Sequence, residues 1–144
     1  MANFCYPSTL RRGDRPGRFT VTFTDLPEAI TWGDGIDDTL WQAADCLEEA
    51  IAGRIRRGDK IPTPSRPKKG QRVVPVPAPM ASKAALYLAL RESGTTKVEL
   101  AKRLRCDEKE VRRLLDPRHP SKLARIEAAL EALGRRLVVG VQAA

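Results

Sequence analysis

A short predicted helix in the C-terminal half carries three basic side chains that could bind nucleic acid. Residues 107–115 read DEKEVRRLL, and their apolar positions are Val111, Leu114 and Leu115. At helical spacing these positions form one stripe, which leaves the cations on the opposite side: Lys109, Arg112 and Arg113. Arginine and lysine so placed can contact base edges and phosphates in the DNA major groove. The same cations could instead solvate an ordinary helical corner, so both interpretations remain open.

The residues before this helix predict a second helix and a tight turn. The apolar positions of the second helix are Leu100, Ala101 and Leu104. Thr96 with Glu99 provides a capping box, and Asp107 with Glu110 repeats it for the basic helix. Two short capped helices of this kind are typical of a helix-turn-helix, whose second helix reads DNA. Side chains at neighbouring helix starts are predicted to touch phosphates: Thr95, Lys97 and Lys122.

The end of the chain is more apolar than a free terminus requires. One helix-turn-helix reads few bases, so a two-fold pair on the DNA is the usual arrangement. We therefore expect a homodimer, or a higher oligomer, joined through Leu137, Val138, Val139 and Val141.

Charge divides unevenly along the chain. The 144 residues carry a formal net charge of +8. Residues 1–65 hold 8 Lys and Arg against 10 Asp and Glu, a net charge of −2. Residues 66–144 hold 18 Lys and Arg against 8 Asp and Glu, a net charge of +10. This asymmetry predicts two parts with different partners, of which the basic part suits a polyanion.

Alternating residue types predict a small sheet in the N-terminal half. Residues 18–24, RFTVTFT, read as a half-buried strand, with a partner strand at 4–10 and a third at 29–32. Gly33 to Gly35 is predicted to break the sheet and open a helix that Gly58 ends. The apolar face of this helix can cover the sheet: Ile36, Leu40, Ala43, Leu47, Ile51 and Ile55.

A stretch rich in proline and basic residues follows this helix. A flexible linker is expected over 62–70, and an edge strand at 72–76 remains an alternative. Helical periodicity resumes at Met80. Ser121 is predicted to cap a last helix, which Gly134 ends.

The sequence offers little that supports catalysis, a metal or a cofactor. Cys5, Cys46 and Cys106 lack CxxC spacing and are expected to be reduced, mostly buried thiols. The single histidine, His119, is expected to be an inert surface residue, although it could touch phosphate. We therefore expect no enzyme. No apolar run approaches the roughly 20 residues of a membrane span and no signal peptide is visible, so a cytoplasmic protein without a membrane partner is expected.

Each of the two tryptophans has an expected place. Trp41 is predicted to flank the seam between helix and sheet. Trp32 ends a strand, where a core position is favoured over an exposed anchor for a partner.

The chain resembles HicB-type antitoxins of bacterial toxin–antitoxin pairs over nearly its whole length. The N-terminal half carries FTVTFTDLPEAITWGDGIDDTLWQAADCLEEAIAGRI and then IPTPS. The C-terminal half, from VPAPMASKAALYLALRESG to LARIEAALEALGRRL, is similar to the subgroup with a helix-turn-helix. The resemblance implies an α+β fold, in which a trimmed RNase H-like domain of antiparallel strands and a helix joins an all-α helix-turn-helix domain. These domains are expected at 1–65 and 80–144, with 66–79 as linker or edge strand.

The resemblance also implies two partners. The first domain would bind and inhibit a small HicA-type ribonuclease toxin, and the second would repress the promoter of the pair by binding double-stranded operator DNA. A ribonuclease holds RNA phosphates on a basic surface, so acidic residues and one tryptophan are predicted to bind it: Asp25, Glu28, Trp32, Asp34, Asp37 and Asp38. Asp37 and Asp38 could equally be helix-end stabilisers.

Two further expectations bear on this interpretation. Arg105 stands where such a turn often has glycine, and a left-handed residue there would cost roughly 1 kcal/mol, which predicts a remodelled turn. The alternative function is a free-standing helix-turn-helix regulator whose N-terminal domain senses a small ligand. A domain of roughly 60 residues buries little beyond its own core, which favours the inhibitor.

Overall fold

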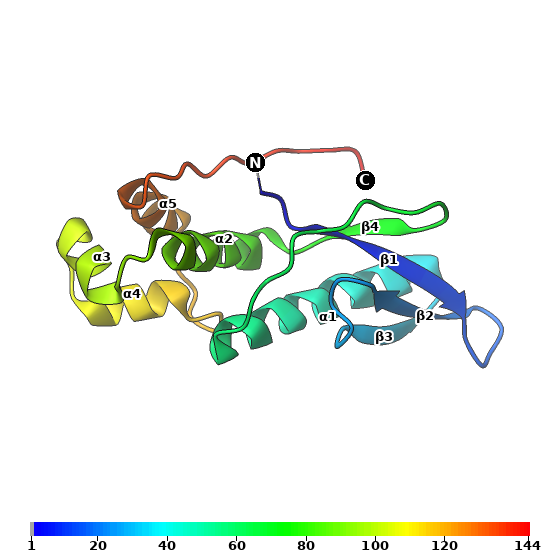
Figure 1. The fold of residues 1–144 in the computed structure, drawn as a ribbon. Helices are drawn as coiled ribbons and strands as arrows, with labels where there is room; N and C mark the ends of the chain where they lie inside the picture. The colour runs from blue at the N-terminus through cyan, green and yellow to red at the C-terminus, as the bar shows by residue number, and fades with distance from the viewer. Residues whose placement is uncertain (1) are drawn as a thin grey trace. The chain divides into compact units, whose positions relative to one another are not determined.

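The first of two units is built on a four-stranded antiparallel sheet with one long helix packed against it (Figure 1). The computed structural model describes residues 2–144, and the chain divides between Ala81 and Ser82. The strands follow the order β3-β2-β1-β4 in the sheet. Their bounds are Cys5–Arg12 for β1, Arg18–Phe23 for β2, Ile30–Asp34 for β3 and Arg72–Pro75 for β4. The chain is therefore α+β, as the sequence predicts.

The alternation of β2 decides which face of the sheet is buried. Val21 and Phe23 are buried, whereas the threonines of the same strand are half-buried. Val21 pairs with Leu10 of β1 and with Thr31 of β3, so its side chain lies at the centre of the sheet. The predicted half-buried strand is confirmed.

Helix α1 (Ile36–Arg57) covers the buried face of the sheet. Its inward stripe includes Thr39, Ala43, Leu47 and Ile51, all buried. Ile36, predicted to belong to this stripe, is exposed in the first turn. The helix ends at Gly58 as predicted, with the glycine in the left-handed conformation (φ 73°) that favours this residue.

Gly33 serves the contact between helix and strand and does not break the sheet. Both Gly33 and Asp34 belong to β3, so the predicted strand end at Trp32 is wrong. A Cβ atom on Gly33 would lie 2.6 Å from backbone atoms of Thr39. Glycine is therefore required because α1 approaches the strand backbone closely here.

Hydrogen bonds hold the segment between α1 and β4 against the first unit. The Tyr6 hydroxyl donates to the Pro62 carbonyl over 2.7 Å. The Ser65 N–H donates to the Asp25 carboxylate over 2.9 Å, and the Ser65 hydroxyl also contacts that carboxylate. Within the linker expected over 62–70, Pro62 and Ser65 are therefore tied to the first unit. The alternative of an edge strand after it is the one found, because β4 pairs antiparallel with β1.

The second unit is helical. Its elements are α2 (Ala78–Ser93, which begins just before the division of the chain), α3 (Lys97–Leu104), α4 (Glu108–Leu115) and α5 (Leu123–Ala132). Its core takes Leu100 from α3, Val111 from α4 and Ile126 from α5, each 2% exposed or less. Both predicted apolar stripes are therefore largely confirmed. The residues after Gly134 form no helix or strand, and Val138, Val139 and Val141 are exposed.

One of the two predicted capping boxes is wrong. The Thr96 hydroxyl accepts a hydrogen bond from the Glu99 N–H over 3.1 Å, as expected for the start of α3. The Asp107 side chain makes no such bond at the start of α4. Glu110 binds Arg113 one turn later instead, with a distance of 2.6 Å between nitrogen and oxygen.

The predicted cap of the last helix is also wrong. Lys122 occupies the N-cap position of α5, one residue after Ser121. The Ser121 hydroxyl has a different partner, because it accepts a hydrogen bond from the Lys83 ammonium group over 2.9 Å. Gly134 follows the helix end in the left-handed conformation (φ 73°), and its N–H donates to the Glu131 carbonyl.

The turn between α3 and α4 keeps the left-handed conformation at Arg105. Its φ and ψ are 54° and 46°, so the remodelled turn expected from the sequence is not formed. Two hydrogen bonds close the turn, from the Arg105 N–H to the Lys102 carbonyl (3.2 Å) and from the Cys106 N–H to the Ala101 carbonyl (3.0 Å). These bonds satisfy carbonyls at the end of α3 and offset the cost of the non-glycine residue.

Candidate protein-binding and nucleic-acid-binding surfaces

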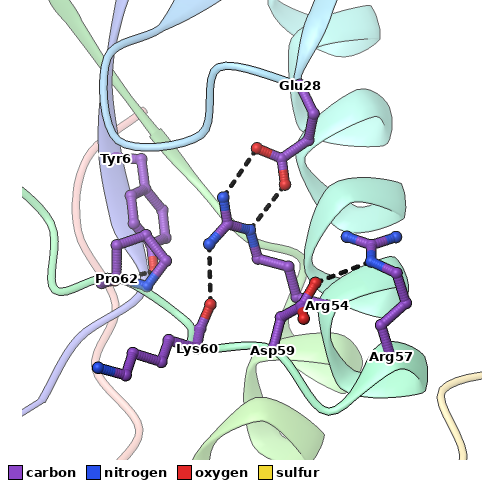
Figure 2. Close-up of polar contacts among 7 residues, drawn as sticks. All are labelled: Tyr6, Glu28, Arg54, Arg57, Asp59, Lys60 and Pro62. Carbon is purple, nitrogen blue, oxygen red and sulfur yellow. Dashed lines mark hydrogen bonds and ion pairs between the residues drawn. The ribbon is translucent and has the colours of Figure 1, made fainter.

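Two of the predicted acidic residues of the first unit are engaged in contacts within it. Arg54 of α1 binds Glu28 through two nitrogen–oxygen contacts of 2.6 Å and 2.9 Å, and donates to the Lys60 carbonyl over 2.8 Å (Figure 2). Asp25 binds the backbone and side chain of Ser65. Glu28 and Asp25 therefore tie the corner between β2 and β3 to α1 and to the segment after it.

Arg54 keeps Glu28 ionised. The hydrogen bond to the guanidinium group lowers the pKa of Glu28, and the same bond raises the pKa of Arg54. Nearby in Figure 2, the Tyr6 hydroxyl meets the Pro62 carbonyl, and burial raises the pKa of Tyr6 to about 12. The cluster holds the end of α1 and the extended segment together, which is a structural task.

Trp32 lies on the open face of the sheet. It is 52% exposed, and the Arg18 guanidinium group lies 3.9 Å from the centre of its ring. Arg18 also binds Asp34 over 3.2 Å. The favoured core position of Trp32 is therefore wrong, because β3 is an edge strand and Trp32 faces away from α1. The alternative predicted for Trp32, an exposed anchor for a partner, is consistent with this exposure.

The acidic residues at the start of α1 are exposed. The Asp38 carboxylate accepts a hydrogen bond from the Asp34 N–H over 2.8 Å, and Asp37 lies beside it in the first turn. Both positions favour the positive end of the helix dipole, so the helix-stabilising alternative is consistent with the structure.

A second acidic surface lies on the outward side of α1 and was missed from the sequence. Trp41 is 63% exposed, so its predicted place at the seam with the sheet is wrong. Asp45, Glu48 and Glu49 follow it at helical spacing, and burial together with the charges of its neighbours raises the pKa of Glu48. Within residues 2–144, no ion pair neutralises these three carboxylates. The spacing of Asp38, Trp41 and Asp45 was the signal that could have identified this face.

The cations of α4 lie on its solvent side. Lys109 is exposed, Arg112 binds Glu108 over 3.1 Å, and Arg113 is held by Glu110. Both ion pairs join residues of the same helix and are substantially exposed. Such pairs contribute little stability, so phosphate or base contacts can replace them at small cost.

The predicted phosphate contacts come from two helix starts of the second unit, with Thr95 and Lys97 at the start of α3 and Lys122 at the start of α5. Lys97 begins α3 and Lys122 precedes α5, and both side chains are exposed. Thr95 is half-buried, and its N–H donates to the Ser93 hydroxyl over 3.1 Å. The three residues belong to one unit with the α4 cations, but Thr95 has the least access to solvent.

Few other side chains of the described residues are candidates for metal binding or thiol chemistry. The three cysteines are free and half-buried, which is less burial than expected. Residues 2–144 bring together no group of three His, Cys, Asp or Glu side chains suited to a metal ion. None of the helices they form is both long and apolar enough to cross a membrane.

Comparison with known proteins gives matches over most of the chain. Residues 5–85 match a family described as the HicB_like antitoxin of bacterial toxin–antitoxin systems. Antitoxin HicB 1 of Photorhabdus laumondii is 36% identical over 140 residues, which cover 97% of this chain and 88% of the relative. Antitoxin HicB of Pseudomonas fluorescens is 36% identical over 132 residues, covering 91% and 90%. Antitoxin HicB of Escherichia coli K12 is 33% identical over 132 residues, covering 92% and 95%.

The Glu28–Arg54 pair predicts an acid-dependent share of stability. Because the folded-state pKa of Glu28 is lowered, its contribution is present above the unfolded-state pKa and disappears as pH falls through the folded-state value. At neutral pH we expect Glu28→Gln to lower the free energy of unfolding by about 0.5–1 kcal/mol. The loss should shrink below about pH 4. Urea unfolding at a series of pH values measures it. Glu49→Gln is the control, and a Glu28→Gln loss independent of pH would contradict the assignment.

Proposed function

Because the chain belongs to the HicB-like family of antitoxins, we propose that it neutralises a small HicA-type ribonuclease toxin and represses the promoter of the pair. Toxin binding is assigned to the unit that ends at Ala81, and DNA binding to the unit that begins at Ser82. The observation that carries this division is the family match, which spans nearly the whole first unit. The difference in net charge supports it, because residues 1–81 hold 12 Lys and Arg against 10 Asp and Glu (+2), whereas residues 82–144 hold 14 against 8 (+6). In this proposal the first unit is a trimmed RNase H-like domain, and α3 and α4 form a helix-turn-helix.

The toxin-binding surface is proposed to include the acidic outward face of α1. A ribonuclease presents basic side chains to RNA, so an inhibitor gains affinity and association rate from opposite charge. The six residues proposed from the sequence are exposed except for Asp25, which is half-buried. Asp25, Glu28 and Asp34 already bind Ser65, Arg54 and Arg18. Trp41, Asp45 and Glu49 extend the exposed set along the helix, with the half-buried Glu48 between them and Trp41 as an aromatic anchor.

Charge reversal on α1 tests toxin binding. We expect Asp45→Lys with Glu49→Lys to weaken inhibition of the toxin by about tenfold or more, because like charges then face each other. Titration of the ribonuclease activity of a HicA-type toxin with the full-length antitoxin measures this. Glu127→Lys with Glu131→Lys makes the same charge change on α5 and should inhibit like the wild type. Equal inhibition by all three proteins would place toxin binding elsewhere.

The DNA-binding surface is proposed to be the solvent side of α4 with its neighbours. Lys109, Arg112 and Arg113 would contact bases and nearby phosphates, and Thr95, Lys97 and Lys122 would contact phosphates. The support for this is the short α3–turn–α4 arrangement, the exposure of Lys109 and Arg112, and the net charge of +6 over residues 82–144. Exposed ion pairs within α4 leave both arginines available for exchange.

Removal of the α4 cations tests operator recognition. Replacement of Lys109, Arg112 and Arg113 by alanine should remove specific binding, since each base-reading arginine contributes roughly 1–3 kcal/mol. Gel-shift titration on the promoter of the pair measures affinity. The matched control replaces three cations of the segment before β4, Arg66, Lys68 and Lys69. The control should bind with a smaller salt dependence yet keep its preference for the promoter. Wild-type affinity in the α4 variant would refute the assignment.

The apolar chain end is proposed to join two copies into a homodimer, or a higher oligomer, on the DNA. Its exposed valines have no role in the fold of the described chain, and Leu137 is half-buried. Deletion of residues 137–144 should therefore halve the mass measured by light scattering. A truncated protein that keeps its oligomeric state would show that another surface joins the copies.

A further inference from the structure

Lys83 of α2 is buried beneath the C-terminal end of α4. Only 4% of its surface is exposed. Its ammonium group donates to the carbonyls of Arg113 (3.1 Å) and Leu114 (3.0 Å) and to the Ser121 hydroxyl (2.9 Å). A lysine ammonium has three donors, so these three acceptors satisfy it completely.

Burial of this ammonium group is energetically unfavourable unless other interactions compensate for its lost hydration. Burial lowers the pKa of Lys83, and the charge of Asp116 acts in the opposite direction. No carboxylate forms an ion pair with Lys83 in the part of the chain that the structure describes. An apolar side chain of similar volume would avoid the cost of desolvation. The compensation comes from carbonyls in the last turn of α4, which carry the negative end of the helix dipole; that of Arg113 also accepts the Asp116 N–H over 3.2 Å.

The ammonium group connects three elements of the second unit. It joins α2 to the end of α4 and to the loop 116–121 that leads into α5. Hydrogen bonds within the loop also hold it, because Asp116 accepts from the N–H groups of Arg118 (2.9 Å) and His119 (3.1 Å). His119 Nδ1 also lies 3.3 Å from the Ser121 hydroxyl. The start of α5, with Lys122, follows directly.

We propose that Lys83 is a positioning residue for DNA binding, whose buried ammonium group fixes the end of α4 and the following loop against α2. This inference rests on the proposed DNA-binding function of the second unit. Base contacts demand a fixed placement of side chains, whereas phosphate attraction tolerates displacement. Lys83 therefore determines sequence preference and does not contribute its charge to the DNA directly.

Lys83→Met in the full-length protein tests this role. Fluorescence anisotropy over a series of salt concentrations compares the promoter of the pair with a scrambled duplex of equal length. We expect binding to the promoter to weaken by about tenfold or more. Binding to the scrambled duplex should stay within about twofold, with an unchanged salt slope, because a buried cation releases no counterions. Lys60→Met, an exposed lysine of the first unit, controls for the lost charge and should keep promoter preference.

Ser121→Ala and amide hydrogen exchange keep the test decisive if Lys83→Met does not fold. Ser121→Ala removes one acceptor, keeps the cation, and should show a smaller loss of promoter preference. Exchange at the Asp116 and His119 amides should accelerate in both variants relative to the wild type, while the α3 amides stay protected.

Unchanged promoter preference and unchanged exchange in a folded variant would overturn the proposal, as would a salt slope reduced by about one. A wild-type protein without promoter preference would instead refute DNA binding, and the exchange data would still judge the positioning role.

Discussion

The packing of α1 on the sheet determines which face of this helix is buried and which face is exposed. Gly33 lets the helix backbone at Thr39 approach β3 closely, and this contact fixes the rotation of the helix about its axis. Once Thr39 and Ala43 face the sheet, the helical period turns Trp41 and Asp45 toward solvent. The acidic outward face is therefore a geometric consequence of the apolar inward face. A substitution that added a side chain at Gly33 would disturb both.

Internal ion pairs separate structural carboxylates from those available to a partner. Glu28 is bound by two nitrogens of Arg54, which also donates to the Lys60 carbonyl, so this carboxylate is engaged within the corner and its connection to α1. The carboxylates of α1 from Asp45 to Glu49 have no such partner within residues 2–144, and burial together with repulsion from Asp45 and Glu49 raises the pKa of Glu48. An approaching cationic surface relieves that repulsion. The carboxylates that are available to a partner therefore lie along α1 more than at the corner between β2 and β3.

Local patterns predicted the elements of the fold well, because each pattern involves residues close in sequence. The alternation of β2, the extent of α1 up to Gly58 and the cap at Thr96 are examples. Errors arose where the deciding partner is distant in sequence. The exposure of Trp32 depends on β3 being an edge strand, which requires the strand order. Ser121 fails to cap α5 because Lys83, 38 residues earlier, binds its hydroxyl. Periodicity along α4 carries no information about Lys83.

The two kinds of cation in the second unit differ in how easily they can be replaced. Arg112 and Arg113 are paired with carboxylates of their own helix in water, so such pairs break and re-form at little cost. Lys83 has three hydrogen-bond acceptors within the fold and is 4% exposed, so its contacts do not exchange with solvent as those of the surface pairs do. Long-range attraction to a polyanion depends on the number of exposed cations and can be rebuilt at many positions. The direction in which α4 presents them depends on its buried apolar stripe and, at its C-terminal end, on the contact with Lys83.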